Sequence, residues 1–148
     1  MDKLIQPLKN KIEKERDIGK ISQWFIIIAK ENEKLAEKLI PDLENKILVE
    51  KSFAKIGRFV GEIAMRGSEE LAEKLIPALK NKIDAEEDIE KIGLCIENIN
   101  FRNEKIGEKL VNNLNIKILK NKVRTEEDIE KINSCIWEII LLDEELGH

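Results

Sequence analysis

The side chains of this chain that could take part in catalysis form no recognisable motif. His148 is the only histidine and the last residue, so no internal histidine can act as a general base. The sequence contains no glycine-rich phosphate loop, no HExxH zinc motif and no nucleophile elbow. Carboxylates are plentiful, but they stand at expected helix starts and surface positions, where solvated side chains are usual. The sequence therefore predicts a protein that is not an enzyme, with no catalytic residue, no cofactor and no metal site.

The two cysteines, Cys95 and Cys135, are the remaining reactive side chains. They do not form a CxxC pair, and they occupy equivalent positions of an internal repeat. Cysteines at corresponding positions of stacked helices usually serve as small apolar side chains. We expect both to be reduced and packed in the core, in preference to a disulfide or to a metal site that would have only His148 to add.

The composition indicates which elements would position a functional site. Apolar residues make up 42% of the 148 residues, charged residues 38% and aromatic residues 4%, and tyrosine is absent. Isoleucine, leucine, lysine and glutamate dominate, which favours helices over β-sheets. The longest apolar run, Trp24–Ala29, is far shorter than the roughly 20 residues of a membrane-spanning helix, and the N-terminus lacks the apolar segment of a signal peptide. We expect one cytoplasmic domain spanning residues 1–148, with no membrane partner.

The charge balance bears on the class of partner. The chain has 26 basic and 30 acidic residues, which gives a net charge of −4. Nucleic-acid-binding domains usually carry a basic excess, because contacts to phosphates supply most of their affinity. The overall charge therefore argues against a nucleic-acid partner.

An internal repeat organises the chain. The segment Leu8–Ile12 returns at Leu43–Ile47, Leu79–Ile83 and Leu119–Val123, at spacings of 35, 36 and 40 residues. A period in this range is typical of a helical solenoid whose unit is a pair of helices. We expect repeats at about residues 1–31, 32–67, 68–102 and 103–142, with a partial fifth unit at 143–148.

Each repeat contains two apolar stripes at helical spacing. In the third repeat the first stripe consists of Ile76, Leu79 and Ile83, which step by three and four residues. The second stripe recurs in every repeat, so its columns should bring the second helices side by side. The members of these columns are Ile18, Ile21, Phe25 and Ile28; Phe53, Ile56, Val60 and Ile63; Ile89, Ile92, Ile96 and Ile99; and Ile129, Ile132, Ile136 and Ile139.

Polar residues mark the expected helix starts. Asp84 and Thr125 each precede an acidic stretch, and we expect them to cap the second helices of their repeats. Asn32, Ser68 and Asn103 precede the first helices in a similar way.

Two further columns concern the first helices. Pro41 and Pro77 recur at one position, where a proline either kinks a long helix or opens a new one. A column of asparagines is expected at helix ends or in a hydrogen-bond ladder between repeats, and consists of Asn10, Asn45, Asn81 and Asn121.

The segment 76–99, IPALKNKIDAEEDIEKIGLCIENI, resembles the pattern of armadillo and HEAT repeats. It has an isoleucine–proline opening, a leucine-rich helix, an acidic turn and a second helix that ends in Ile96–Ile99. The resemblance extends over essentially the whole chain and implies an all-α fold, a right-handed α-solenoid (α-α superhelix) of about four two-helix HEAT/armadillo-like repeats. The spacings of 35 and 36 residues are closer to HEAT repeats, whereas the last, of 40, approaches armadillo length through extra residues near 111–115. A tetratricopeptide array is the alternative, although its Trp-Leu-Gly-Tyr pattern is missing.

In these families the second helices line the concave face, where partners bind. Carried over by position, the resemblance places on this face Gln23 and Ile27, Arg58 and Glu62, Leu94 and Asn98, and Ser134 and Glu138. One turn further along are Lys30, Met65, Phe101 and Leu141. Only Asn98 matches the asparagine with which armadillo repeats hold an extended peptide, whereas Ile27, Glu62 and Glu138 depart from it. We therefore do not expect peptide binding through an asparagine ladder.

Three more columns are candidates for packing or for binding. Met65, Phe101 and Leu141 form either an apolar strip for a partner helix or plugs at the hairpin ends. Trp24, Phe59, Cys95 and Cys135 share a column that we expect to pack beside the core. Trp137 falls in the column of Ile26, Gly61 and Glu97, where expected exposure makes it a contact candidate.

A lysine column also recurs in all four repeats, at Lys20, Lys55, Lys91 and Lys131. These lysines either meet an acidic partner or a phosphate backbone, or form ion pairs one turn apart on a solvated face. The candidate pairs are Glu87–Lys91 and Glu127–Lys131. Interspersed glutamates favour the second interpretation.

These patterns predict a non-catalytic scaffold for protein–protein interaction that binds a protein or peptide along the second helices. The expected contact residues are Gln23, Ile27, Arg58, Glu62, Met65, Leu94, Asn98, Phe101, Ser134, Trp137 and Glu138. The alternatives are a nucleic-acid-binding module that uses the lysine column, and a structural or sensor segment of a larger multidomain protein. Because the chain enters and leaves in the middle of a unit, self-association through uncapped repeat ends is also expected.

Overall fold

The computed structural model describes residues 2–147, and every regular element in this range is helical, with no strand. The predicted all-α class is confirmed. Four helix pairs follow one another, namely α1 (Asp2–Lys14) with α2 (Ile18–Glu31), α4 (Ile40–Val49) with α5 (Phe53–Glu62), α7 (Ile76–Ala85) with α8 (Ile89–Arg102), and α10 (Ile116–Thr125) with α11 (Ser134–Glu145). The remaining elements are α3 (Glu33–Lys38), the π-helix η1 (Ile63–Gly67), α6 (Glu69–Glu73), α9 (Glu104–Asn113) and the 3-10 helix η2 (Ile129–Lys131).

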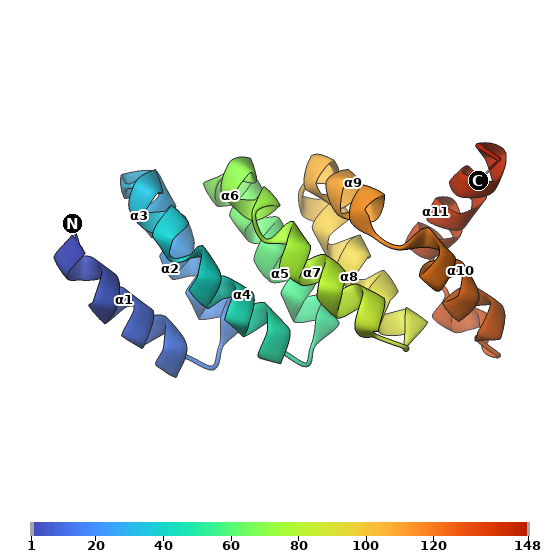
Figure 1. Ribbon diagram of the computed structural model, residues 1–148, viewed down its shortest axis with the longest axis horizontal. Helices are drawn as coiled ribbons and strands as arrows, with labels where there is room; N and C mark the ends of the chain where they lie inside the picture. Colours follow the sequence, from blue (N-terminus) through green and yellow to red (C-terminus); the bar gives the residue numbers. More distant parts are fainter. Residues whose placement is uncertain (1, 148) are drawn as a thin grey trace.

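The helix pairs lie side by side in one row, with the two ends of the chain at opposite ends of the row (Figure 1). In this view α1, α4 and α7 run across the front, and α2, α5 and α8 lie behind them. Helix α4 packs between α1 and α7, and α5 packs between α2 and α8. Residues about one repeat apart in the sequence therefore become neighbours in space.

The predicted apolar columns form one continuous core. Every column member in the second and third pairs is buried, from Phe53 at 5% exposure to Ile92 at 0%. In the outer pairs Ile28 and Ile139 are half-buried. Burial is therefore complete only where a pair has neighbours on both sides.

The second helix of the fourth pair starts later than its column predicts. Asp128 caps the short helix η2, and the backbone is then extended at Ile132 and Asn133, with ψ of 103° and 171°. Helix α11 therefore begins only at Ser134. Ile129, whose column mates are buried, is left 66% exposed, which corrects the prediction that it packs in the core.

The predicted caps of the first helices are confirmed. The side chains of Asn32, Ser68 and Asn103 each accept a hydrogen bond from the backbone N–H three residues ahead, at 3.1, 3.2 and 3.0 Å. These bonds satisfy N–H groups that have no partner within the helix. The three residues are therefore the N-caps of α3, α6 and α9, as predicted.

The predicted caps of the second helices are wrong. Asp84 and Thr125 lie within the preceding helices α7 and α10. Within α7 the Asp84 carboxylate pairs with Lys80 one turn back, at 2.6 Å, an arrangement that favours the helical conformation. The residue that caps α8 is Asp88, whose Oδ1 accepts from the Glu90 N–H at 3.0 Å.

The recurring prolines open new helices. Pro41 and Pro77 are the second residues of α4 and α7, which begin at Ile40 and Ile76. Proline is tolerated there because its missing N–H would have no partner in the first turn. Of the two alternatives predicted for these prolines, a kink in a long helix or the start of a new helix, the structure shows the start of a new helix.

Helices α5 and α8 make the most extensive contact between neighbouring pairs, and it depends on two glycines. A Cβ atom at Gly57 would lie 2.4 Å from the Cys95 carbonyl oxygen, and one at Gly61 would lie 2.8 Å from Cδ of Arg102. Both distances are shorter than van der Waals contact. Glycine at these positions therefore lets the two helices approach closely.

A ladder of lysines joins neighbouring pairs. Lys46, Lys82 and Lys122 occupy the same repeat position, and each Nζ donates to a backbone carbonyl of the preceding pair. The acceptors are equivalent residues near the ends of α1, α4 and α7: Glu13 at 2.8 Å, Leu48 at 2.8 Å and Asp84 at 2.9 Å. A cation at a helix C-terminus satisfies carbonyls that have no partner within the helix.

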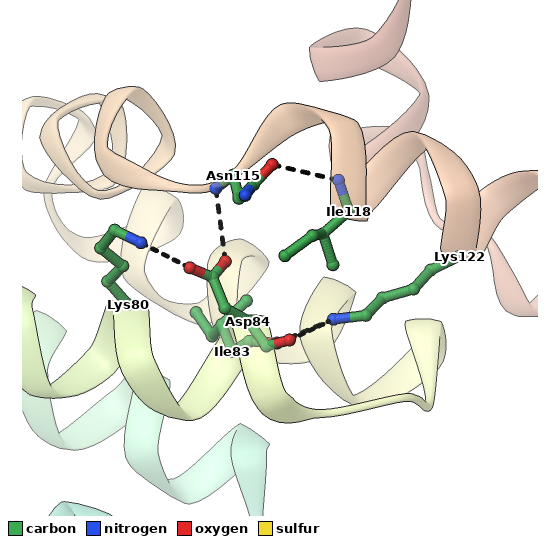
Figure 2. Close-up of polar contacts among 6 residues, drawn as sticks. All are labelled: Lys80, Ile83, Asp84, Asn115, Ile118 and Lys122. Carbon is green, nitrogen blue, oxygen red and sulfur yellow. Dashed lines mark hydrogen bonds and ion pairs between the residues drawn. The ribbon is translucent and has the colours of Figure 1, made fainter.

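Figure 2 shows the last of these junctions. Lys122 reaches the carbonyls of Asp84 and Ile83, and Oδ1 of Asp84 accepts from the Asn115 N–H at 3.3 Å. Asn115 in turn caps α10 by accepting from the Ile118 N–H at 3.2 Å. Burial lowers the pKa of Lys122, an effect that the carboxylates of Asp84, Glu86 and Glu87 oppose.

The predicted asparagine ladder is therefore replaced by a lysine ladder one residue further along. The asparagines of the column are exposed and lie within helices, at Asn10, Asn45, Asn81 and Asn121. Asn10, for example, accepts from the Gln6 amide one turn back in its own helix, at 2.9 Å. An exposed asparagine can also bond to water, so the column needs no partner from the next repeat.

Replacing Lys122 by methionine is expected to lower the free energy of unfolding by about 1–2 kcal/mol, because the substitution removes charged hydrogen bonds to two carbonyls. Lys117 on the same helix is exposed, and Lys117→Met provides a control with the same change of charge. Urea unfolding followed by circular dichroism would measure both. Equal stabilities for the two variants would show that the ladder does not stabilise the junction.

Candidate binding surface on the second helices

A groove between α2 and α5 brings together three of the predicted contact residues. Gln23, Arg58 and Glu62 line this groove, which has a volume of about 270 Å³. Lys55 and Arg66 also line it, and Phe59 and Ile26 are among its apolar residues. Three of the predicted contact residues therefore share one depression in the surface.

The groove carries cations that the rest of the described chain does not neutralise. Within residues 2–147, Lys55 and Arg58 are exposed and form no ion pair. Glu62, by contrast, pairs with Arg102 at 3.0 Å and with Arg66 at 3.7 Å. Asp17 also lines the groove, so the lining carries three cations and two carboxylates, and the two cations of α5 without an ion-pair partner give it a small positive excess.

Arg102 forms hydrogen bonds with Asn98 and Glu62, which stand at the positions of the armadillo asparagines. Its Nε donates to Glu62, and its Nη1 donates to the Asn98 carbonyl at 3.1 Å and to Asn98 Oδ1 at 3.3 Å. The Asn98 Nδ2 donates to the Leu94 carbonyl at 2.8 Å. Asn98 and Glu62 thus form hydrogen bonds within the protein, and their role as partner contacts stays a prediction. The arginine at 102 gave no sign of this role in the sequence.

The apolar side chains predicted one turn further along the second helices are exposed. Phe101 is 84% exposed, Met65 52% and Leu141 58%. Ile27 and Leu94, on the preceding turn, are 61% and 39% exposed. The hypothesis that the first three plug the hairpin ends is wrong, because a plug would be buried.

The lysine column does not form the ion pairs expected of it. Lys20, Lys55, Lys91 and Lys131 are all exposed, and over the described residues Glu87 and Glu127 do not pair with Lys91 and Lys131. The helix starts explain this difference. Asp88 and Asp128 are the capping residues, so Glu87 and Glu127 precede the helices and do not share a helical face with the lysines.

The predicted residues on α11 lie apart from the groove. Ser134 and Glu138 are exposed, and Glu138 lines a separate hollow of about 380 Å³ with residues of α8 and α9. Trp137 is half-buried and packs against the core, which corrects the expectation that it is exposed. The structure thus does not gather the predicted ladder at one site: three members line the groove, and Glu138 lines the separate hollow.

The two thiols differ in environment. Cys95 is fully buried, and burial raises its pKa to about 12. Cys135 is half-buried beside Asn100, and its pKa is also raised, first by burial. No cluster of three histidine, cysteine or acidic side chains suited to a metal ion occurs in the part of the chain that the structure describes, and His148 lies outside it.

Thiol labelling of the native protein is therefore expected to separate the cysteines. At mildly alkaline pH, Cys135 should react slowly with iodoacetamide, and Cys95 should react only after unfolding in urea. The reason is that the thiolate is the nucleophile, and Cys95 has neither access nor a populated thiolate. Mass spectrometry of tryptic peptides would check the order, and a Cys135→Ser variant that still labels readily would contradict it.

None of the helices within residues 2–147 combines the length and apolarity needed to cross a membrane. Comparison of the chain with protein-family models, with curated proteins and with solved structures returned no match. The surface along the second helices is therefore the main indication of function.

Proposed function

We propose that the chain is a right-handed α-solenoid of about four HEAT/armadillo-like repeats that acts as a non-catalytic interaction scaffold. Its partner is an acidic, amphipathic segment of another protein, bound along the second helices. The side-by-side helix pairs and the recurring lysine junctions support a solenoid.

The observation that carries the proposal is the groove between α2 and α5, with its two cations that lack an ion-pair partner in the described range. Charge complementarity at such a surface speeds association and selects partners. The exposed Met65 and Phe101 lie further along the same helical face and offer apolar contacts. An acidic helix with apolar side chains on one side satisfies both features.

The proposal is tested with a labelled synthetic helical peptide that has glutamates on one face and leucines on the other, by fluorescence anisotropy. We expect Arg58→Glu to weaken binding by about tenfold, because it reverses a charge that faces the peptide. Lys34→Glu makes the same change of charge on the exposed side of α3 and should have little effect. Phe101→Ala is expected to weaken binding without changing the charge.

Two outcomes would contradict the proposal. Equal affinities of the Arg58→Glu and Lys34→Glu variants would show that the groove does not hold the peptide. Binding of single-stranded DNA that falls steeply with salt and depends on Lys20, Lys55 and Lys91 would instead favour a nucleic-acid-binding module.

A further inference from the structure

The end face at the first helix pair exposes residues whose counterparts in the second and third pairs are buried. At the first pair, Leu8, Trp24 and Ile28 are half-buried. Their counterparts in the second and third pairs are almost fully buried: Leu43, Phe59 and Ile63, and Leu79, Cys95 and Ile99. The first face is hollowed, with a volume of about 190 Å³ lined by Leu8, Lys11, Ile12, Trp24, Ile27 and Ile28. We call it the N-face.

Trp137 marks the opposite face, which we call the C-face. At each internal junction its column contacts the pair that follows. Ile26 lies against Gly67, Gly61 against Arg102, and Glu97 accepts from Asn133 at 3.2 Å. Trp137 is the fourth member of this column. It is half-buried against the core, and its position in the column is the one that would contact a following pair.

Lys11 is the N-face member of the lysine ladder. Lys46, Lys82 and Lys122 each donate to a carbonyl of the preceding pair, at Glu13, Leu48 and Asp84. Lys11 instead lies over the Trp24 ring, 4.7 Å from its centroid. On the C-face, the position equivalent to those three acceptors is Arg124, near the end of α10.

We propose that the chain stacks head to tail on a second copy of itself, with the N-face of one copy on the C-face of the next. Lys11 then donates to the carbonyl of Arg124, and Trp24 and Trp137 become buried. The argument for a second copy is that both faces belong to one repeating surface, whose complementarity the internal junctions already demonstrate three times. Because such an interface joins two different faces, it does not close on a dimer and permits open-ended growth.

The proposal is tested by light scattering and sedimentation of the whole chain over a range of concentrations. We expect the average mass to rise with concentration beyond that of a dimer. Lys11→Glu, which alters the N-face, and Trp137→Lys, which alters the C-face, should each lower the mass toward that of the monomer. Phe101→Glu, away from both faces, should leave the mass unchanged, and circular dichroism would verify the fold of each variant.

Mixing the two end-face variants gives the sharpest result. Each retains one intact face, so an equimolar mixture should form one-to-one dimers that cannot grow. A self-complementary interface would not produce this behaviour, and neither would non-specific association. A wild-type chain that stays monomeric at all concentrations, or a mixture that stays monomeric while wild type grows, would overturn the proposal.

Tryptophan fluorescence supplies an independent readout, because the chain has two tryptophans, one in α2 of the first pair and one in α11 of the last, and both are half-buried. Stacking should shift the emission maximum to shorter wavelength as concentration rises, and Lys11→Glu should abolish the shift. An emission maximum that does not change while the mass rises would place the contact elsewhere and overturn the assignment of these faces. Peptide binding at Arg58 is measured separately, so failure of either proposal leaves the other distinguishable.

Discussion

Replacing Gly57 by alanine is expected to lower the free energy of unfolding by about 2 kcal/mol, although alanine favours helices over glycine by about 1 kcal/mol. The added Cβ would lie 2.4 Å from the Cys95 carbonyl oxygen and 2.9 Å from the Asn98 Cβ. Neither atom can move away by a side-chain rotation, so α5 and α8 have to separate. Guanidinium unfolding, followed by circular dichroism, measures the change.

Gly67→Ala is the matched control for this substitution. Its added Cβ would lie 3.4 Å from Cγ1 of Ile26, which is an ordinary van der Waals contact. We expect Gly67→Ala to change stability by less than about 0.5 kcal/mol, as at other sites without a clash. If Gly57→Ala proved as stable as Gly67→Ala, the close approach of α5 and α8 would not be a feature of the folded protein.

The elements that periodicity specifies were predictable from the sequence. The apolar columns place Phe25, Val60 and Ile96 in the core because helical spacing alone decides which side of a helix they share. Asn32 and Ser68 cap as expected because a side-chain oxygen before an apolar run is a local signal. Prolines at the second helical position could be recognised only as one of two alternatives, since a kink and a new helix give the same pattern.

Features that depend on contacts between repeats could not be predicted. Arg102 engages Asn98 and Glu62 because Gly61, in the preceding pair, leaves room for its side chain. No local signal in the sequence links these residues. The lysine ladder likewise depends on where the preceding helix ends, and the acidic stretch after Asp84 predicts that end too early. Three residues of the groove share the predicted face of the second helices, whereas the pairing of Glu62 with Arg102 of the next pair could not be predicted from the sequence.

Phe59→Ala is expected to lower the free energy of unfolding by about 3–5 kcal/mol, the typical loss for truncating a buried phenylalanine. Phe59 is 1% exposed in α5, between the first and third pairs, so truncation leaves a cavity that neighbours on both sides cannot fill. Since small domains have only about 5–15 kcal/mol of stability, the variant should unfold at much lower denaturant concentration.

Phe101→Ala removes the same side chain from a second helix of the next pair and provides the comparison. Phe101 is 84% exposed, so its truncation should change the free energy of unfolding by less than about 0.5 kcal/mol. The two phenylalanines therefore separate structural from surface roles: the buried one should be needed for folding, and the exposed one only for binding the acidic peptide. A large loss of stability in Phe101→Ala would mean that its ring packs within the protein, and would remove it from the proposed binding surface.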